Sequence, residues 1–359
     1  MTNSELQHLS NDFFQNSLVS SPTSAIMRGY REYFDQIEDL SGETFDKEEQ
    51  RVNEFISRLE KIDLNTLSHR EKITHGMLEF ALSSNKDALL DKNWEFGAGV
   101  SGYTGYLIDY NQRLFIPDVE CADLLLKRLE LYERLFTQIA QVQKEGLLIN
   151  RVATKRNLLR TIDQLENYLN TPLDKDTLLL VNFSTDIGEL EISSWKEKAK
   201  KIIETNVRPA VLAYLDQLRE EHLPKGRTDE KSGIFWIEGG EETYLRALRR
   251  YTGHKDTTVQ EVHSIGISEI ERLKTEFFEI GKNVFPDAKS PEEVIYKMQT
   301  EPAMRYESKE QMLQIAEDTI ERSYKPLDKW FTVFPKSPCK VLPAPPESEQ
   351  HAPPAYYVA

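Results

Sequence analysis

Apolar residues recur along most of the chain at intervals of three and four positions. This spacing places them on one face of an α-helix and is the main sequence signal of helical structure. The clearest apolar stripes lie at 52–59, 125–142 and 152–169. The pattern predicts a mainly α fold in which more than half of the residues are helical.

Capping signals support several of these helices. In a capping box, a Ser or Thr side chain accepts a hydrogen bond from the third helical N–H, and a Glu or Gln at that third position bonds back. Four residue pairs have this spacing: Ser68 and Glu71, Thr258 and Glu261, Ser290 and Glu293, and Ser308 and Gln311. Each pair predicts the start of a helix.

Three stretches interrupt the helical pattern. Residues 94–117 combine glycines with aromatics, residues 171–194 mix an apolar run with turn residues, and residues 234–237 are apolar and precede two glycines. Such residues between turn signals are typical of strands. We expect loops or short strand pairs in the first two stretches and a short strand in the third.

The C-terminal segment has a different composition. Seven of the 16 prolines lie between Pro335 and Pro354, which favours extended backbone. Residues 355–358 then suit a strand, and no later segment is present to pair with it. Because natural domains rarely leave such a strand uncovered, we expect the front part of a larger protein, with an unfinished C-terminal strand.

With 39% apolar and 29% charged residues, the 359-residue chain has the composition of a globular protein. The net charge of −15 disfavours nucleic acid and anionic membrane surfaces as partners. The sequence also has no signal-peptide pattern at its N-terminus and no run of 18 apolar residues, which predicts a cytoplasmic protein. Its two cysteines, Cys121 and Cys339, exclude a disulfide framework.

Motifs for common chemistry are absent or lack their structural context. Residues 97–102 match the dinucleotide-binding spacing G-x-G-x-x-G, but the pattern predicts neither the preceding strand nor the following helix that bind pyrophosphate. His69 and His75 have the wrong spacing for a zinc-binding pair on one helix. We interpret the glycines as a loop and these histidines as solvated helix positions.

An ordered set of residues in the second half of the chain carries a family resemblance. It begins with Gly240, Tyr244, Leu248, Arg249 and Thr252, and continues with Glu261, Val262, His263, Gly266 and Glu269. Phe331, Pro335, Val341, Pro343 and residues 355–357 follow. In this order and spacing, the chain resembles the bacterial family known as domain of unknown function 885. One position departs, because the family often has proline where this chain has Gly239.

The resemblance implies the helical N-terminal portion of a zincin-like metallopeptidase fold. Family members carry a His-Glu-x-x-Pro-Gly-His helix after the tyrosine pair, in which two histidines would bind Zn²⁺ and the glutamate would activate water. None of the seven histidines here is followed by glutamate. The resemblance therefore implies zinc for full-length members, but no cofactor, metal ligand or catalytic residue in this chain.

The same resemblance implies a substrate-binding role for Tyr244, Arg249, His263, Tyr356 and Tyr357. These residues are expected to form part of one wall of the substrate cleft. Tyr244 and His263 could offer hydrogen bonds to a peptide carbonyl or an oxyanion. A tyrosine one turn before Leu248 is also typical of a helix core, so a structural role for Tyr244 stays open.

Two functional hypotheses follow. In the first, residues 1–225 form an N-terminal helical region, and residues 226–359 begin a peptidase-like region that stops before the metal-binding helix. The chain would then be inactive alone, and its partner would be the missing C-terminal half or a peptide substrate. In the second, the chain is a non-catalytic, acidic, helical interaction module.

Overall fold

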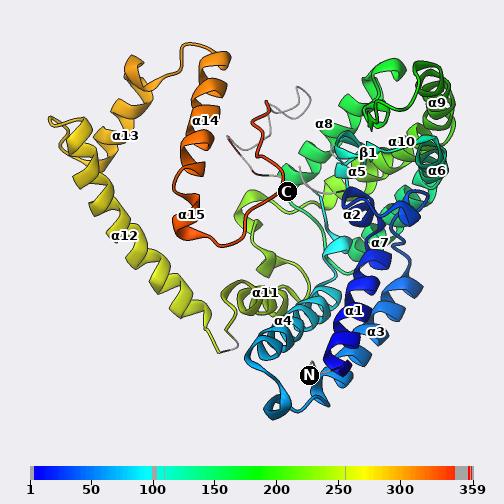
Figure 1. Cartoon of the computed structure of the whole chain (residues 1–359), viewed down its shortest axis with the longest axis horizontal. Coiled ribbons are helices and arrows are strands. Elements are labelled where there is room, and N and C mark those ends of the chain that lie inside the picture. The colour runs from blue at the N-terminus through cyan, green and yellow to red at the C-terminus, as the bar shows by residue number, and fades with distance from the viewer. Residues whose placement is uncertain are drawn as a thin grey trace. The chain divides into compact units, whose positions relative to one another are not determined.

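The computed structural model describes residues 4–98, 103–108, 110–254, 256–343, 355 and 357. Helix accounts for 73% of the structure, which confirms the predicted mainly α class. The chain forms two compact units, Met1–Asp256 and Thr257–Ala359 (Figure 1). Their division lies later than the expected boundary at 225, because the backbone of Arg227 bonds to Ala153 and Lys155 and holds this segment in the first unit. A peptidase-like character of residues 226–359 stays a prediction.

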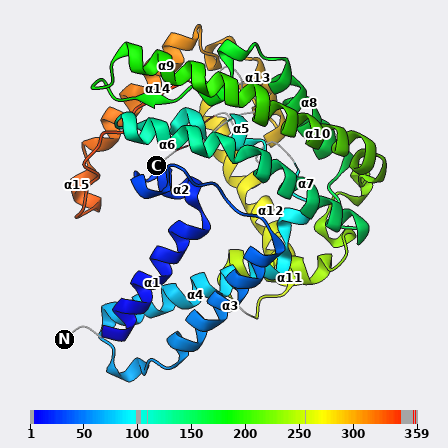
Figure 2. The same ribbon diagram turned by 90° about the vertical axis from the view of Figure 1, so that its right-hand side faces the viewer.

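The first unit is built mainly from helices. They are α1 (Ser4–Ser20), α2 (Pro22–Met27), α3 (Gly42–Glu60), α4 (His69–Asp91), α5 (Gly105–Ile108), α6 (Val119–Glu130), α7 (Tyr132–Leu148), α8 (Lys155–Asn170), α9 (Glu189–Ile202), α10 (Arg208–Gln217) and α11 (Gly240–Thr252). Figure 2 shows α6 to α10 together in one group and α1, α3 and α4 in another. In the first group, α10 packs against both α7 and α8.

The larger apolar core of the first unit lies among α6 to α10 and contains the predicted stripe at 125–142. Leu125, Leu129, Leu135 and Ile139 are all buried. The stripe spans two helices, because the α-helix is interrupted at Leu131.

The other two predicted stripes also face the interior, except at one position of α8. A smaller core joins α1, α3 and α4 through Leu9, Phe55 and Leu82, as the stripe at 52–59 predicted. On α8, Leu158 is buried, whereas Leu159 of the predicted stripe is exposed.

The strands are few and short, as expected. β1 (Phe115–Ile116) and β2 (Asn182–Phe183) come from the first two interrupting stretches and form a parallel pair with each other. The strand expected at 234–237 is wrong, because Ile234–Trp236 forms a 3₁₀ turn, η11, which lies against α11. The C-terminal strand expected at 355–358 falls largely outside the described residues, and its described residues, 355 and 357, are not in a strand.

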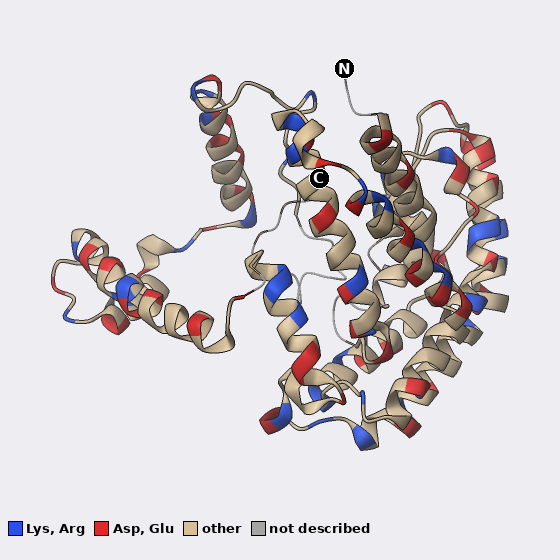
Figure 3. Ribbon diagram, turned by 90° about the horizontal axis from the view of Figure 1, so that it is seen from below, with Lys and Arg blue, Asp and Glu red and all other residues tan. Residues whose placement is uncertain are grey.

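The second unit contains α12 (Val259–Val284), α13 (Pro291–Thr300), α14 (Lys309–Tyr324) and α15 (Leu327–Trp330). In this unit, α12 packs against α13. Acidic and basic residues are interspersed along the helices of the chain (Figure 3). None of the helices in the described part of the chain is long and apolar enough to cross a membrane.

All four predicted capping residues begin helices. Ser68 and Thr258 form complete capping boxes at the starts of α4 and α12. Ser290 and Ser308 accept the bond from the third helical N–H of α13 and α14. In these two helices, the side chains of Glu293 and Gln311 accept a bond from the residue before the cap, and not from the cap itself.

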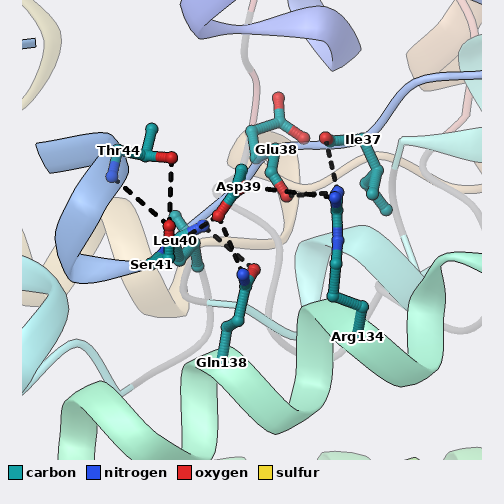
Figure 4. A network of polar contacts seen from close by, with 8 residues as sticks. All are labelled: Ile37, Glu38, Asp39, Leu40, Ser41, Thr44, Arg134 and Gln138. Atoms are coloured by element: carbon teal, nitrogen blue, oxygen red, sulfur yellow. Dashed lines mark hydrogen bonds and ion pairs between the residues drawn. The ribbon is translucent and has the colours of Figure 1, made fainter. Parts of the chain in front are cut away.

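A polar network attaches the segment before α3 to α7 (Figure 4). Arg134 of α7 donates to the carbonyls of Ile37 and Glu38, at 3.2 and 3.3 Å. Gln138, one turn later, donates to Asp39 Oδ1 at 2.8 Å and accepts a bond from the Leu40 N–H at 3.0 Å. These bonds satisfy main-chain groups that no regular element would satisfy, and they fix where α3 begins relative to α7.

Asp39 makes this network sensitive to pH. Burial acts to raise the pKa of Asp39, but hydrogen bonds from Ser41 and Gln138 and the charge of Arg134 outweigh it and hold the pKa below its usual value of 3.8. A carboxyl group with a lowered pKa in the fold stabilises the fold above its unfolded pKa, and this contribution is lost as the pH falls through the folded pKa.

We therefore expect Asp39→Asn to lower the free energy of unfolding at about pH 7 and to have a smaller effect at about pH 3. Urea unfolding of both proteins across this range measures the difference. Asp46→Asn, at an exposed position of α3, is the matched control and should show little effect at either pH. A deficit for Asp39→Asn that stays constant with pH would contradict the assignment.

Candidate functional site

Helix α11 begins with two glycines that are required for different reasons. Gly239 has φ +67°, a left-handed conformation that proline cannot adopt, which accounts for the departure from the family's frequent proline. Gly240 lies against η11, where an added Cβ would be 2.0 Å from the carbonyl oxygen of Ile234. The glycine therefore permits η11 to lie directly on the first turn of α11.

A buried carboxylate holds the rest of α11 in place. Asp91 is the last residue of α4, and its side chain is 0% exposed. Arg246 Nε lies 2.6 Å from Asp91 Oδ1, and Arg250 Nη1 lies 3.2 Å from Asp91 Oδ2. The two arginines are one turn apart on α11, so this ion cluster fixes both the position and the rotation of the helix.

Arg151 connects the same cluster to two further segments. Its guanidinium donates to the main-chain carbonyls of Asp91 and Glu238, and its Nε lies 2.5 Å from Glu95 Oε2 in the 3₁₀ turn η3 (Asn93–Glu95). Arg151 also lies over the ring of Phe96. The approach of η3 to α7 depends on Gly146, where a Cβ would be 2.6 Å from the carbonyl oxygen of Glu95.

The electrostatics explain why several arginines meet at this point. A carboxylate at the C-terminal end of a helix opposes the helix dipole, and a buried charge without partners is strongly destabilising. Without partners, the Asp91 carboxylate would be destabilising for both reasons. The charges of Arg246 and Arg250 offset both effects, so the contact between α4 and α11 stabilises the end of α4.

This arrangement leaves two of the predicted substrate-binding residues of α11 exposed to solvent. Tyr244 is 43% exposed, which excludes the core role left open for it. Arg249 is exposed, and its Nη2 makes a long ion pair, 3.9 Å from Asp87 Oδ1. Thr243 and Leu248 of the same helix are buried.

The other predicted site residues lie elsewhere. His263 is on α12 in the second unit and is exposed, and Tyr357, in the same unit, is 78% exposed. Tyr356 lies outside the described residues. Only Tyr244 and Arg249 therefore share an element, and a joint site for all five stays a prediction.

Sequence reasoning missed the residues that position α11. Asp91 and Arg151 had no distinctive local pattern. Arg246 and Arg250 did carry a signal, because two arginines four positions apart on a helix that also has Leu248 face a common surface. Their partner, at the end of another helix, could not be identified from spacing alone.

Within the described residues, no group of three or more His, Cys, Asp or Glu side chains could hold a metal ion. Cys121 and Cys339 are free thiols, and burial is the main cause that raises the pKa of Cys121 to about 11. The glycine-rich segment at 97–102 lies mostly outside the described residues. On α11, Tyr244 and Arg249 are exposed side chains that can donate hydrogen bonds.

Gly240→Ala should destabilise the first unit by at least about 2 kcal/mol, because overpacking against backbone cannot be relieved by a rotamer change. Gly76→Ala in α4 is the matched control. It has nothing within 4 Å of its added Cβ and should stabilise the helix by about 0.5–1 kcal/mol. Thermal and urea unfolding measure both. Equal effects of the two substitutions would contradict the close approach of η11 to α11.

The chain is similar in structure to a solved protein and in sequence to a protein family. The crystal structure of "the putative lipoprotein from Colwellia psychrerythraea" has a similar fold, with a TM-score of 0.82 and 17% sequence identity. The match covers 98% of this chain, which spans only 64% of the length of that relative. Among curated proteins, none matches the sequence. The family described as "Bacterial protein of unknown function (DUF885)" matches residues 22–359, and the chain therefore belongs to this family.

Proposed function

We propose that this chain forms the helical, metal-free portion of a zinc-dependent peptidase and that α11 lines its substrate site. The family membership supports this proposal through the peptidase character that the resemblance implies. The observation that carries it is the exposure of two hydrogen-bonding side chains on α11. Tyr244 and Arg249 are presented to solvent by a helix that the Asp91 cluster holds fixed.

The chemistry of these two side chains suits the binding of a peptide. A tyrosine hydroxyl and a guanidinium are hydrogen-bond donors, and the peptide group and the terminal carboxylate both offer acceptor oxygens. Donors held in a fixed position lose little entropy when they bind, and they can stabilise charge that develops on a carbonyl oxygen. The two residues would bind and orient the substrate.

The zinc site that the family resemblance implies does not fit the residues present. A peptidase zinc site needs three protein ligands and an open position, and the described part of this chain gathers no such set. We therefore assign no catalytic step to this chain. Its proposed part is to bind and position the peptide, and the metal would be held by a further portion of the protein.

The alternative is a non-catalytic interaction module. The observation that favours it is the large exposed apolar surface of the second unit, which includes Ile265, Leu273 and Trp330. The two proposals differ in whether a zinc-dependent reaction appears when the remaining portion of the protein is supplied.

The test is co-expression of this chain with the portion of a close homologue that corresponds to the part of the longer relative outside the match. Alone, the chain should hold no stoichiometric zinc and hydrolyse no peptide. The mixture should show zinc-dependent hydrolysis of a fluorogenic peptide. Tyr244→Phe and Arg249→Gln should each lower kcat/KM by about tenfold, the effect of losing one good hydrogen bond.

Arg156→Gln is the matched control, because Arg156 is an exposed arginine paired with Asp229 and lies outside α11. It should leave kcat/KM unchanged. Full activity of both α11 variants would refute a substrate role for these two side chains. A mixture that forms a complex but has no peptidase activity would favour the interaction module.

A further inference from the structure

The second unit has almost no core of its own. Among its described residues, Ala288 and Val294 are the apolar side chains that are buried. On α12, Val259, Ile270, Leu273, Ile280 and Val284 are between 44% and 59% exposed. We call these five residues the α12 stripe.

The α12 stripe is a continuous face of one helix. Its members, the half-buried Val262 and Phe277, and Gly266 recur at three- and four-residue intervals, which aligns them along one side. The helix has 26 residues and is therefore about 39 Å long. An apolar face of this length is large for a surface that remains in water.

The packing of α13 leaves this face open. At Gly281 of α12, an added Cβ would lie 2.7 Å from Cγ1 of Val294, so α13 approaches α12 closely at that position. Gly281 is buried by this contact. It lies about 60° around the helix from the middle of the stripe at 3.6 residues per turn, and the five stripe residues stay 44% to 59% exposed beside this contact.

More apolar surface is exposed later in the same unit. Met312 and Ile315 of α14 are each 42% exposed. Phe331 and Phe334, which follow α15, are 59% and 46% exposed. The stripe is thus part of a unit whose helices expose apolar side chains throughout.

We propose that the α12 stripe is the docking surface for an amphipathic segment of the same protein, corresponding to the part of the longer solved relative that this chain does not span. The inference rests on the proposed function, and it names the partner that would complete the peptidase. Its support is the match itself. Nearly the whole chain, 98%, aligns with that relative, yet 36% of the relative's length has no counterpart here (100 − 64).

The occupant must therefore present an apolar face of comparable length, flanked by polar residues. Burial of exposed Ile, Leu and Val side chains provides the driving force. The mixed charges beside the stripe, such as Arg272 with Glu269 and Glu276, form pairs within α12, so they leave the partner's specificity to the apolar contacts.

The first experiment uses hydrogen exchange of the full chain alone. Because the stripe is open, the amides of α12 should exchange at least about tenfold faster than those of α7, which is buried in the first unit's core. Slow exchange throughout α12 in the monomer would show that the chain already covers this face, and it would overturn the proposal. A dimer that dissociates on Ile270→Ser would show that a second copy is the occupant, with the same consequence.

The second experiment adds the corresponding segment of a close homologue and measures binding by light scattering and calorimetry. A one-to-one complex with slowed exchange in α12 is expected. The double variant Ile270→Ser/Leu273→Ser should weaken binding by at least about 100-fold, the loss expected for two buried aliphatic side chains. Ile265→Ser/Ile267→Ser, on the same helix but outside the stripe, is the matched control and should weaken binding less than about threefold.

The outcomes separate the two proposals. Binding that depends on the stripe without peptidase activity would retain the docking surface and refute the peptidase. Unchanged binding of the stripe variant, or an equal loss with the control variant, would refute the docking surface whether or not activity appears. Circular dichroism of both variants alone shows that they fold, since all four substituted side chains are exposed in the chain.

Discussion

The buried carboxylate of Asp91 is the interaction on which the functional surface of the first unit depends. A charge removed from water at the wrong end of a helix needs opposite charges close by. Arg246 and Arg250 supply them from α11, and Arg151 binds the main chain at the same place. Through its side chain and its main-chain carbonyl, Asp91 thereby joins α4, α11 and the connection between α7 and α8. The exposure of Tyr244 and Arg249 follows from this anchoring.

The two units differ in how much of their apolar surface they bury. The first unit buries its helical stripes in cores of its own, around residues such as Tyr132 and Tyr214. In the second unit, α12 to α15 are regular helices with good caps but little buried apolar surface. Caps and helix propensity can define a helix, but tertiary packing supplies most helical stability. The second unit therefore exposes much apolar surface, which the proposed docking requires.

Local structural features could be predicted from the sequence. The stripe at 125–142 identified the main core, the four capping residues located helix starts, and two of the stretches that interrupt the helical pattern each supplied a strand. These features depend on residues within a few positions of one another. The turn at 234–236 was predicted wrongly because its conformation depends on Gly240, which lets the carbonyl of Ile234 approach α11. Tyr244 and Arg249 are both exposed on α11, and their role in a site stays a prediction. The residues that position α11 could not be predicted, because Asp91 is 155 residues away from Arg246 and no spacing rule connects them.

The most direct measurement of this account is a double-mutant cycle with Asp91→Asn and Arg246→Met, followed by native-state hydrogen exchange of α11. If the buried ion cluster anchors the helix, each substitution lowers the free energy of opening α11, and the coupling between them is at least about 1.5 kcal/mol, within the range found for residues in one network. Effects that add to within about 0.5 kcal/mol, with α11 still strongly protected in the double variant, would contradict the claim that Asp91 holds this surface in place.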